Sequence, residues 1–188
     1  NRVFIVEVMG HKVGWLTLYA GVASGADIIL LPEIPYDINK VVEAIEKRNK
    51  QGKGFTILAV AEGAISKEDA KLSKKELKKK RENSKHPTVS YELAEEITRL
   101  TGSEARVTVP GPTQRGGSPC PYDRVLCTRL GAAAAMAIMD KDYGNMIAMR
   151  NGETVRVPLE EVAGKLKMVD PNCQMIKEVK LMGISFGD

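Results

Sequence analysis

The first 60 residues alternate three short apolar runs with two helical patterns, and this alternation constrains the fold more than any other feature. The apolar runs are rich in β-branched residues and predict buried strands at residues 3–8, 27–31 and 55–60. The patterns between them predict helices at residues 14–23 and 37–50. Strands joined by crossover helices pair in parallel. The sequence therefore predicts an α/β fold, with an open, mainly parallel sheet flanked by helices.

Further elements are expected along the chain. In the first helix, Leu16, Tyr19 and Ala20 have the spacing of one face, and Gly25 is the expected stop. The later patterns predict a helix at 90–100, a strand at 104–109, a helix from 121 to about 140, and a hairpin around Asn151-Gly152. The tail from residue 165 has weak periodicity and predicts no element.

The net charge of +4 comes from one segment. Residues 67–85 hold nine Lys or Arg and four acids, whereas the rest of the chain holds 19 basic and 20 acidic residues. The segment predicts a solvated helix face. Because the body of the chain is neutral and has only nine aromatic residues, nucleic-acid binding is not expected.

The composition also excludes other classes of protein. Three cysteines, Cys120, Cys127 and Cys173, form no disulfide framework or metal-ligand spacing, which favours a reducing cytoplasm. No apolar run approaches the roughly 20 residues that span a bilayer, so no membrane partner is expected. The chain starts almost directly on an apolar run, and we expect further residues upstream.

Polar loops follow three of the expected strands, at the edge where open α/β sheets bind ligands. Gly10 and Gly14 permit close backbone approach to a ligand, and the following helix start offers free N–H groups to an anion. Glu62 can accept hydrogen bonds from hydroxyls, and Arg115, flanked by glycines, can present its guanidinium to a phosphate. A carboxylate for hydroxyls and arginines for phosphate indicate a phosphorylated polyol or sugar.

Five segments carry a resemblance to a known family: EVMGHKVGWLTLYAG, ADIILLPE, ILAVAEG, ARVTVPGPTQRGGSPCPYDR and GISFGD. They resemble the phosphofructokinase family over nearly the whole chain, and some stretches look more like its mixed ATP/pyrophosphate branch. The resemblance is to the C-terminal half of the family's polypeptide, which carries the fructose 6-phosphate site. It implies phosphoryl transfer from ATP or pyrophosphate to O1 of fructose 6-phosphate in glycolysis, in the cytoplasm.

The resemblance also implies roles for single residues. Met9 and Gly10 would contact the sugar, Glu62 would bind its hydroxyls, and Arg115 would hold the 6-phosphate. Arg2 and Arg106 look like the two arginines that reach into this site from a neighbouring subunit, so a homo-oligomer, usually a tetramer, is implied.

Departures from the family pattern affect three positions. His11 stands where many bacterial ATP-dependent members have an arginine, which makes it a candidate transition-state contact; no other catalytic residue is assigned. Pro112 stands where they have a histidine. Gln51 replaces one basic residue of their effector site and only Lys53 remains, so nucleotide control is not expected.

The resemblance divides the chain into three parts. Residues 1–112 would form the fructose 6-phosphate domain, with the insertion at 67–87; residues 113–164 would return to the donor-binding lobe; residues 165–188 would form a tail. The ligands of Mg²⁺ and the catalytic Asp are expected in the absent half, and no metal ligand is predicted here, so the isolated chain is expected to be inactive. Two alternatives are a non-catalytic sugar-phosphate-binding module and an interaction subunit whose basic insertion docks a partner.

Overall fold

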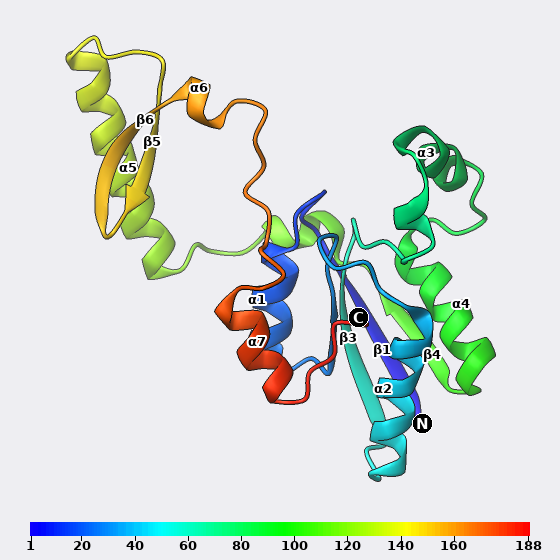
Figure 1. The fold of residues 1–188 in the computed structure, drawn as a ribbon. Coiled ribbons are helices and arrows are strands. Elements are labelled where there is room, and N and C mark those ends of the chain that lie inside the picture. The colour runs from blue at the N-terminus through cyan, green and yellow to red at the C-terminus, as the bar shows by residue number, and fades with distance from the viewer. The chain divides into compact units, whose positions relative to one another are not determined.

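The computed structural model describes residues 1–188, which divide into two compact units. Unit 1 comprises Asn1–Gln114 and Met168–Asp188, and unit 2 comprises Arg115–Lys167. Figure 1 labels the elements of both units along the chain. None of the helices combines the length and the apolar character of a membrane-spanning segment.

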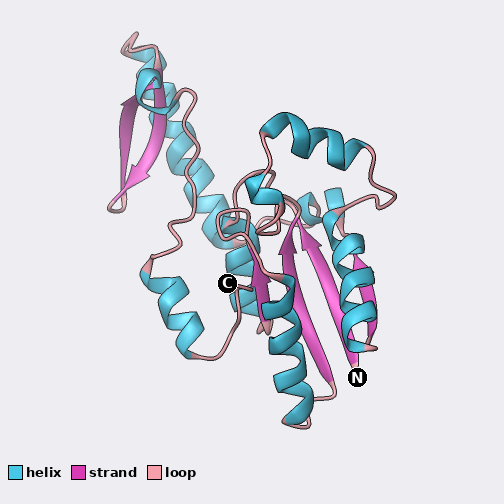
Figure 2. Cartoon of the chain, turned by 45° about the vertical axis from the view of Figure 1, so that its right-hand side comes forward, coloured by secondary structure: helices cyan, strands magenta, loops and turns pink.

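A four-stranded parallel sheet with the order β2-β3-β1-β4 forms the centre of unit 1 (Figure 2). Its strands are β1 Arg2–Val8, β2 Ile28–Leu30, β3 Phe55–Ala61 and β4 Glu104–Thr108. The helices of this unit are α1 Trp15–Ser24, α2 Ile38–Lys50, α3 Lys74–Glu82, α4 Val89–Thr101 and α7 Gln174–Leu181, with 3-10 turns at Asp69–Lys71 and Gly111–Arg115. The predicted α/β fold with a parallel sheet flanked by helices is confirmed.

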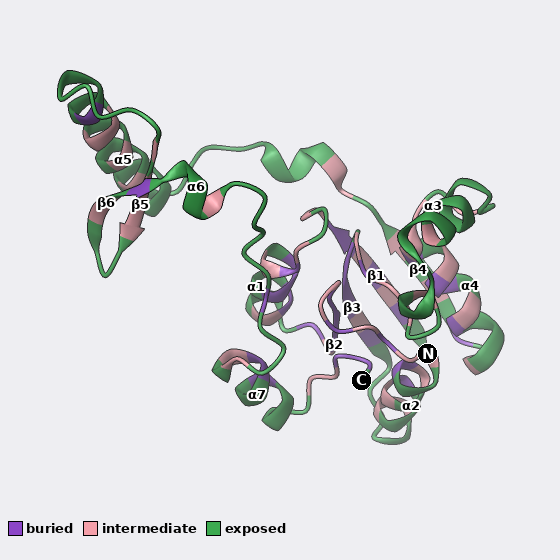
Figure 3. Cartoon of the chain, turned by 45° about the horizontal axis from the view of Figure 1, so that its top comes forward, coloured by how far each residue is buried: buried purple, intermediate pink, exposed green.

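Two apolar cores lie on opposite faces of the sheet. On one face, α2 and α4 pack through residues such as Val41, Ile45 and Ile97. On the other, α1 and α7 pack through residues such as Leu18 and Ile176 against β2 and β3. The second core includes no residue of β1 or β4, so the face of those two strands that carries Phe4 and Arg106 is only partly covered within unit 1 (Figure 3).

The first helix differs from its predicted packing. Leu16, Tyr19 and Ala20 are exposed, and the buried residues of α1 are Thr17, Leu18 and Gly21. Gly21 explains the choice of face, because a Cβ there would lie 2.7 Å from Ile29. The small residues let the helix approach the sheet closely, and this contact decides which face is buried.

Unit 2 consists of a long helix, a hairpin and a short helix. These are α5 Pro121–Met139, β5 Asn145–Arg150, β6 Glu153–Pro158 and α6 Leu159–Val162. The hairpin turns at Asn151 and Gly152, both at positive φ, as the Asn-Gly pair predicts. In the tail, where the sequence predicts no element, α7 forms and Ser185 pairs with Ile28 at the edge of the sheet.

Candidate functional site

The chain leaves β1 through a tight turn, residues 9–14, which we call the sugar turn after the role that the sequence resemblance implies for it. The Val13 N–H donates to the carbonyl of Gly10 at 3.1 Å. A Cβ at Gly10 would lie 2.6 Å from the Val13 oxygen, so this position requires glycine. His11 adopts a φ of +57°, which is uncommon outside glycine. The turn is therefore a specific backbone shape placed at the carboxyl edge of the sheet.

Glu62 holds the first half of this turn. It directly follows β3, which pairs with β1 so that Ala61 lies opposite Val8. Its Oε1 accepts the N–H of Gly10 at 3.1 Å and that of His11 at 2.5 Å. One carboxylate oxygen thus fixes the backbone, and Oε2 remains available to accept hydrogen bonds from hydroxyls. The structure brings Met9, Gly10 and Glu62 together.

Arg115 follows a residue that contacts the same turn. The Met9 N–H donates to Oε1 of Gln114 at 3.3 Å, and Nε2 of Gln114 donates to the carbonyl of Gly111 at 3.2 Å. Arg115 ends the 3-10 turn, is exposed and makes no ion pair. It is also the first residue of unit 2. The chain therefore enters unit 2, with a free guanidinium, directly after a contact with the sugar turn.

Arg2 and Arg106 lie away from the sugar turn. Arg2 begins β1 and Arg106 lies opposite Phe4 in the neighbouring strand. At about 3.3 Å per residue, roughly 23 Å of strand separates Arg2 from Met9 and roughly 17 Å separates Arg106 from it. Both contact Glu104: Nη2 of Arg106 is 2.8 Å from Oε1, and Nε of Arg2 is 3.6 Å from Oε2. The hydrogen bond from Arg106 lowers the pKa of Glu104.

Two residues that contact the sugar turn, Gln114 and Glu33, were not predicted from the sequence. In the loop of Gln114, the neighbouring Arg115 was the predicted site residue. Glu33, just after β2, accepts the N–H of Gly14 at 2.9 Å with Oε1. A carboxylate at a strand end, next to Pro32, was the available signal for Glu33, and the partner 19 residues away was not visible in the pattern.

The side chain of His11 is exposed and makes no hydrogen bond or ion pair, so its role stays a prediction. No group of three or more His, Cys, Asp or Glu side chains lies in position to hold a metal ion. The residues present therefore do not fit a magnesium site.

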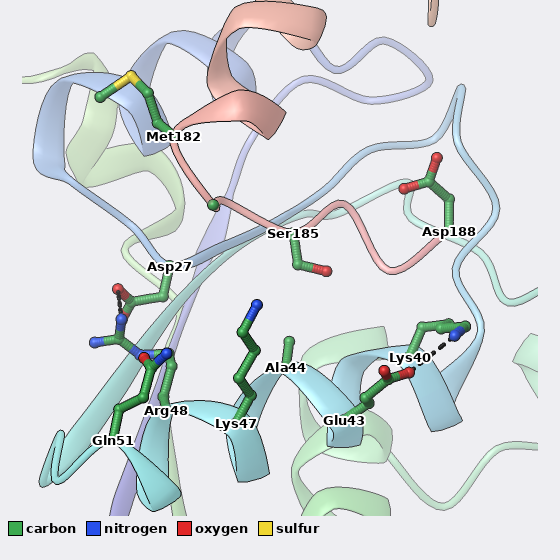
Figure 4. A pocket seen from close by; sticks show the side chains of 11 residues that line it. Asp27, Lys40, Glu43, Ala44, Lys47, Arg48, Gln51, Met182, Ser185 and Asp188 are labelled. Carbon is green, nitrogen blue, oxygen red and sulfur yellow. Dashed lines mark hydrogen bonds and ion pairs between the residues drawn. The ribbon is translucent and has the colours of Figure 1, made fainter.

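A cavity of about 450 Å³ lies elsewhere, between α2 and the C-terminal segment (Figure 4). Its acids are engaged in ion pairs: Asp27 with Arg48 at 2.8 Å, Glu43 with Lys40 at 2.8 Å, and Asp188 with Lys180. Gln51 lines it, whereas none of the six sugar-site residues predicted from the sequence does. This cavity is thus separate from the sugar turn.

Comparisons with known proteins identify the family of this chain. The phosphofructokinase family model matches residues 1–138. An ATP-dependent 6-phosphofructokinase of Spirochaeta thermophila is 54% identical over 188 residues, all of this chain and 51% of the relative. The pyrophosphate–fructose 6-phosphate 1-phosphotransferase of Amycolatopsis methanolica is 44% identical over 170 residues, 90% of this chain and 50% of the relative. The chain thus spans about half the length of these relatives.

Solved structures show the same fold. Pichia pastoris phosphofructokinase in the T-state superposes with a TM-score of 0.65 at 35% identity, covering 85% of this chain and 17% of that one. Pyrophosphate-dependent phosphofructokinase from Nitrosospira multiformis gives a TM-score of 0.75 at 21% identity, covering all of this chain and 49% of that one. With the family model covering most of its length, this chain belongs to the phosphofructokinase family.

Proposed function

We propose that this chain supplies the fructose 6-phosphate site of a 6-phosphofructokinase, which transfers a phosphoryl group to O1 of the sugar. The observation that carries the proposal is the sugar turn, held by Glu62 and followed through Gln114 by an unpaired Arg115. Backbone at Met9 and Gly10 would contact the sugar, and Oε2 of Glu62 would accept from its hydroxyls. Arg115 would bind the 6-phosphate through its guanidinium.

Arg2 and Arg106 would bind the 6-phosphate of a neighbouring subunit. They lie too far along their strands to serve the sugar turn of their own chain, and they occupy the partly covered face of β1 and β4. A second copy seated on that face would receive both guanidinium groups, which makes the assembly a homo-oligomer with shared sites.

The donor, Mg²⁺ and the catalytic base would be held by the part of the enzyme outside this chain. Within this chain, binding orients the sugar so that O1 faces the donor. One relative is named as an ATP-dependent enzyme and another as a pyrophosphate-dependent one, so both donors are candidates.

A non-catalytic sugar-phosphate-binding module is the second candidate. It would bind fructose 6-phosphate through the same turn and the same Glu62 carboxylate, without transfer of a phosphoryl group. A coupled assay on the purified protein with fructose 6-phosphate, in parallel with ATP and pyrophosphate, separates the two. Turnover supports the kinase, and binding of fructose 6-phosphate without turnover supports the module.

The residue roles are tested by Arg115→Ala in the complete enzyme. Loss of the guanidinium should raise the KM for fructose 6-phosphate at least tenfold, since charge-assisted phosphate contacts are among the stronger polar interactions. The KM for the donor should stay nearly constant. Arg150→Ala, at another exposed arginine of unit 2, is the matched control. Equal changes in both KM values would contradict the assignment of Arg115.

A further inference from the structure

The lysine-rich helix α3 has two chemically different sides. At about 100° per residue, Glu76, Leu77 and Lys80 lie on one side. Leu77 is half-buried there, and Lys80 pairs with Asp69 and with Glu92 of α4. This is the side by which the helix is attached to the rest of unit 1.

The other side of α3 carries five cations within about 160° of arc. We call them the cationic face: Lys74, Lys75, Lys78, Lys79 and Arg81. All five are exposed, and Figure 3 shows α3 exposed along most of its length. Only Lys78 makes an ion pair, with Glu82 at 3.7 Å. The other four positive charges therefore stand without a partner.

The remaining acids of the segment do not neutralise this face. Asp69 is engaged by Lys80, and Glu76 accepts the N–H and the hydroxyl of Ser73 in the helix cap. Glu68 makes no ion pair and precedes the helix. Since the chain outside residues 67–85 holds 19 basic and 20 acidic residues, the excess positive charge is confined to this segment.

The cationic face also contains internal repulsion. Lys74 and Lys78 are four positions apart, as are Lys75 and Lys79, and like charges at this spacing destabilise a helix. The helix has nine residues, fewer than an isolated helix needs in water, and none of them is buried. An anion bound across the face would relieve the repulsion and order α3 further.

The composition of the segment restricts the kind of anion. Residues 67–85 include no aromatic side chain, so nucleic-acid bases would find nothing to stack on. Leu77 lies on the attached side, so the face offers no apolar side chain to a bilayer. Because the rest of the chain is neutral, a wide anionic surface would gain little beyond this one helix. A short linear anion fits the face better.

The spacing of the lysines matches an extended peptide. Four residues of helix rise about 6 Å, which separates Lys74 from Lys78 and Lys75 from Lys79 along the axis. In an extended chain, side chains on the same side repeat every second residue, about 6.6 Å apart. Carboxylates at alternate positions of such a chain can therefore meet successive lysines.

We propose that the cationic face docks an extended acidic segment of a partner protein, with Asp or Glu at every second position. The proposal is independent of the proposed function, because the face includes none of the residues assigned to the sugar. The probe is a fluorescein-labelled peptide of alternating Glu and Ser, and its binding to the complete enzyme is measured by fluorescence anisotropy. Binding should weaken as salt rises, since exposed charges are screened.

A second peptide tests the register. It has the same composition, with all Glu residues in one block, and should bind several-fold more weakly than the alternating peptide. Hydrogen exchange of the α3 amides should slow when the alternating peptide is bound, because local stability follows local contacts.

The triple variant Lys74→Gln, Lys75→Gln and Lys79→Gln tests the face itself. Its Kd for the alternating peptide should rise about tenfold, the combined effect of three exposed charge pairs. All three positions are exposed, so the variant should keep its fold, which urea unfolding checks.

The matched control loses the same charge elsewhere. Lys50→Gln, Lys53→Gln and Lys177→Gln together change three exposed lysines that lie outside residues 67–85 and make no ion pair. This variant should bind the alternating peptide nearly as the wild type does. Equal weakening in both triple variants would show that net charge, not the cationic face, attracts the peptide.

The other outcomes are equally decisive. A wild type that does not bind the alternating peptide at low salt overturns the docking face, as does unchanged binding by the α3 triple variant. Equal binding of the two peptides overturns the extended register. Tighter binding of inorganic polyphosphate, single-stranded DNA or phosphatidylserine vesicles than of the peptide overturns the assignment of the partner to an acidic polypeptide.

Discussion

At the scale of single residues, the sugar turn depends on glycine where no other residue fits. Gly63 follows Glu62, and a Cβ built there would lie 2.1 Å from the backbone oxygen of His11. Backbone cannot move aside as a flexible side chain can. Gly63→Ala should therefore displace the turn from the Glu62 carboxylate, at a cost of about 1–3 kcal/mol in the free energy of unfolding, and raise the KM for fructose 6-phosphate.

Urea unfolding and steady-state kinetics of the complete enzyme check both parts of this expectation. Gly54→Ala is the control, because a Cβ at Gly54 meets no atom within 4 Å and its φ is not in the left-handed region. That variant should keep its stability and its KM. Equal behaviour of the two variants would show that the turn tolerates displacement.

The sequence could predict the loops that compose the candidate site but not its hydrogen bonds. Gly10 and Glu62 follow strands, and the carboxyl ends of parallel strands meet at one edge, so their proximity follows from the fold class. The hydrogen bonds depend on the direction of each side chain. Glu62 bonds to the backbone of residues 10 and 11, and Gln114 bonds to Met9, which lies 105 positions away in the sequence. Local pattern contains no information on such directions.

At the scale of elements, α3 is ordered by its own contacts rather than by burial. Ser73 and Glu76 form a reciprocal cap, and none of its residues is buried. Lys80 forms ion pairs with Asp69 of the preceding 3-10 turn at 2.6 Å and with Glu92 of α4 at 3.8 Å. These ion pairs are the tether of α3. The solvated helix face predicted from the lysine-rich sequence is confirmed, and the helix adds nothing to either core.

Two single variants of α3 should therefore behave differently. Lys80→Gln removes the tether and should speed hydrogen exchange of the α3 amides, since local stability follows local contacts. Lys79→Gln, one position away and without an ion pair, should leave exchange unchanged and alter the free energy of unfolding by less than about 0.5 kcal/mol. Faster exchange in both would mean that general charge, not the tether, holds the helix.

Two helices, α1 and α7, differ from the sequence prediction for physical reasons. The spacing of Leu16, Tyr19 and Ala20 predicts one face of α1, whereas the sheet contacts the face with Gly21, where the small residue permits close approach. The helix α7 is short, and its buried residues are Ile176 and Val179 only. Its position depends on packing against α1 and on the pairing of Ser185 with β2, which are tertiary contacts.

At the scale of the whole molecule, variants of the arginines distinguish a site shared between two chains from a site within one chain. If Arg106 serves the neighbouring subunit, a site needs Arg115 from one chain and Arg106 from the other. Arg106→Ala and Arg115→Ala should each show a large loss of kcat/KM for fructose 6-phosphate when prepared alone. When they are mixed and reassembled in equal amounts, one site of each hybrid pair regains both arginines. About a quarter of the wild-type sites should then be restored in a random mixture.

The mixing experiment distinguishes the shared site from a site within one chain. If Arg106 acts on its own chain, every site in a hybrid lacks one arginine and no activity returns. Arg150→Ala mixed with Arg106→Ala provides the control, because half of all sites in that mixture keep both arginines whether or not subunits exchange. Any loss of activity there measures damage caused by the reassembly procedure. The position of Arg106 along β4, with its guanidinium beside Glu104 and some five residues of strand short of the sugar turn, favours restoration.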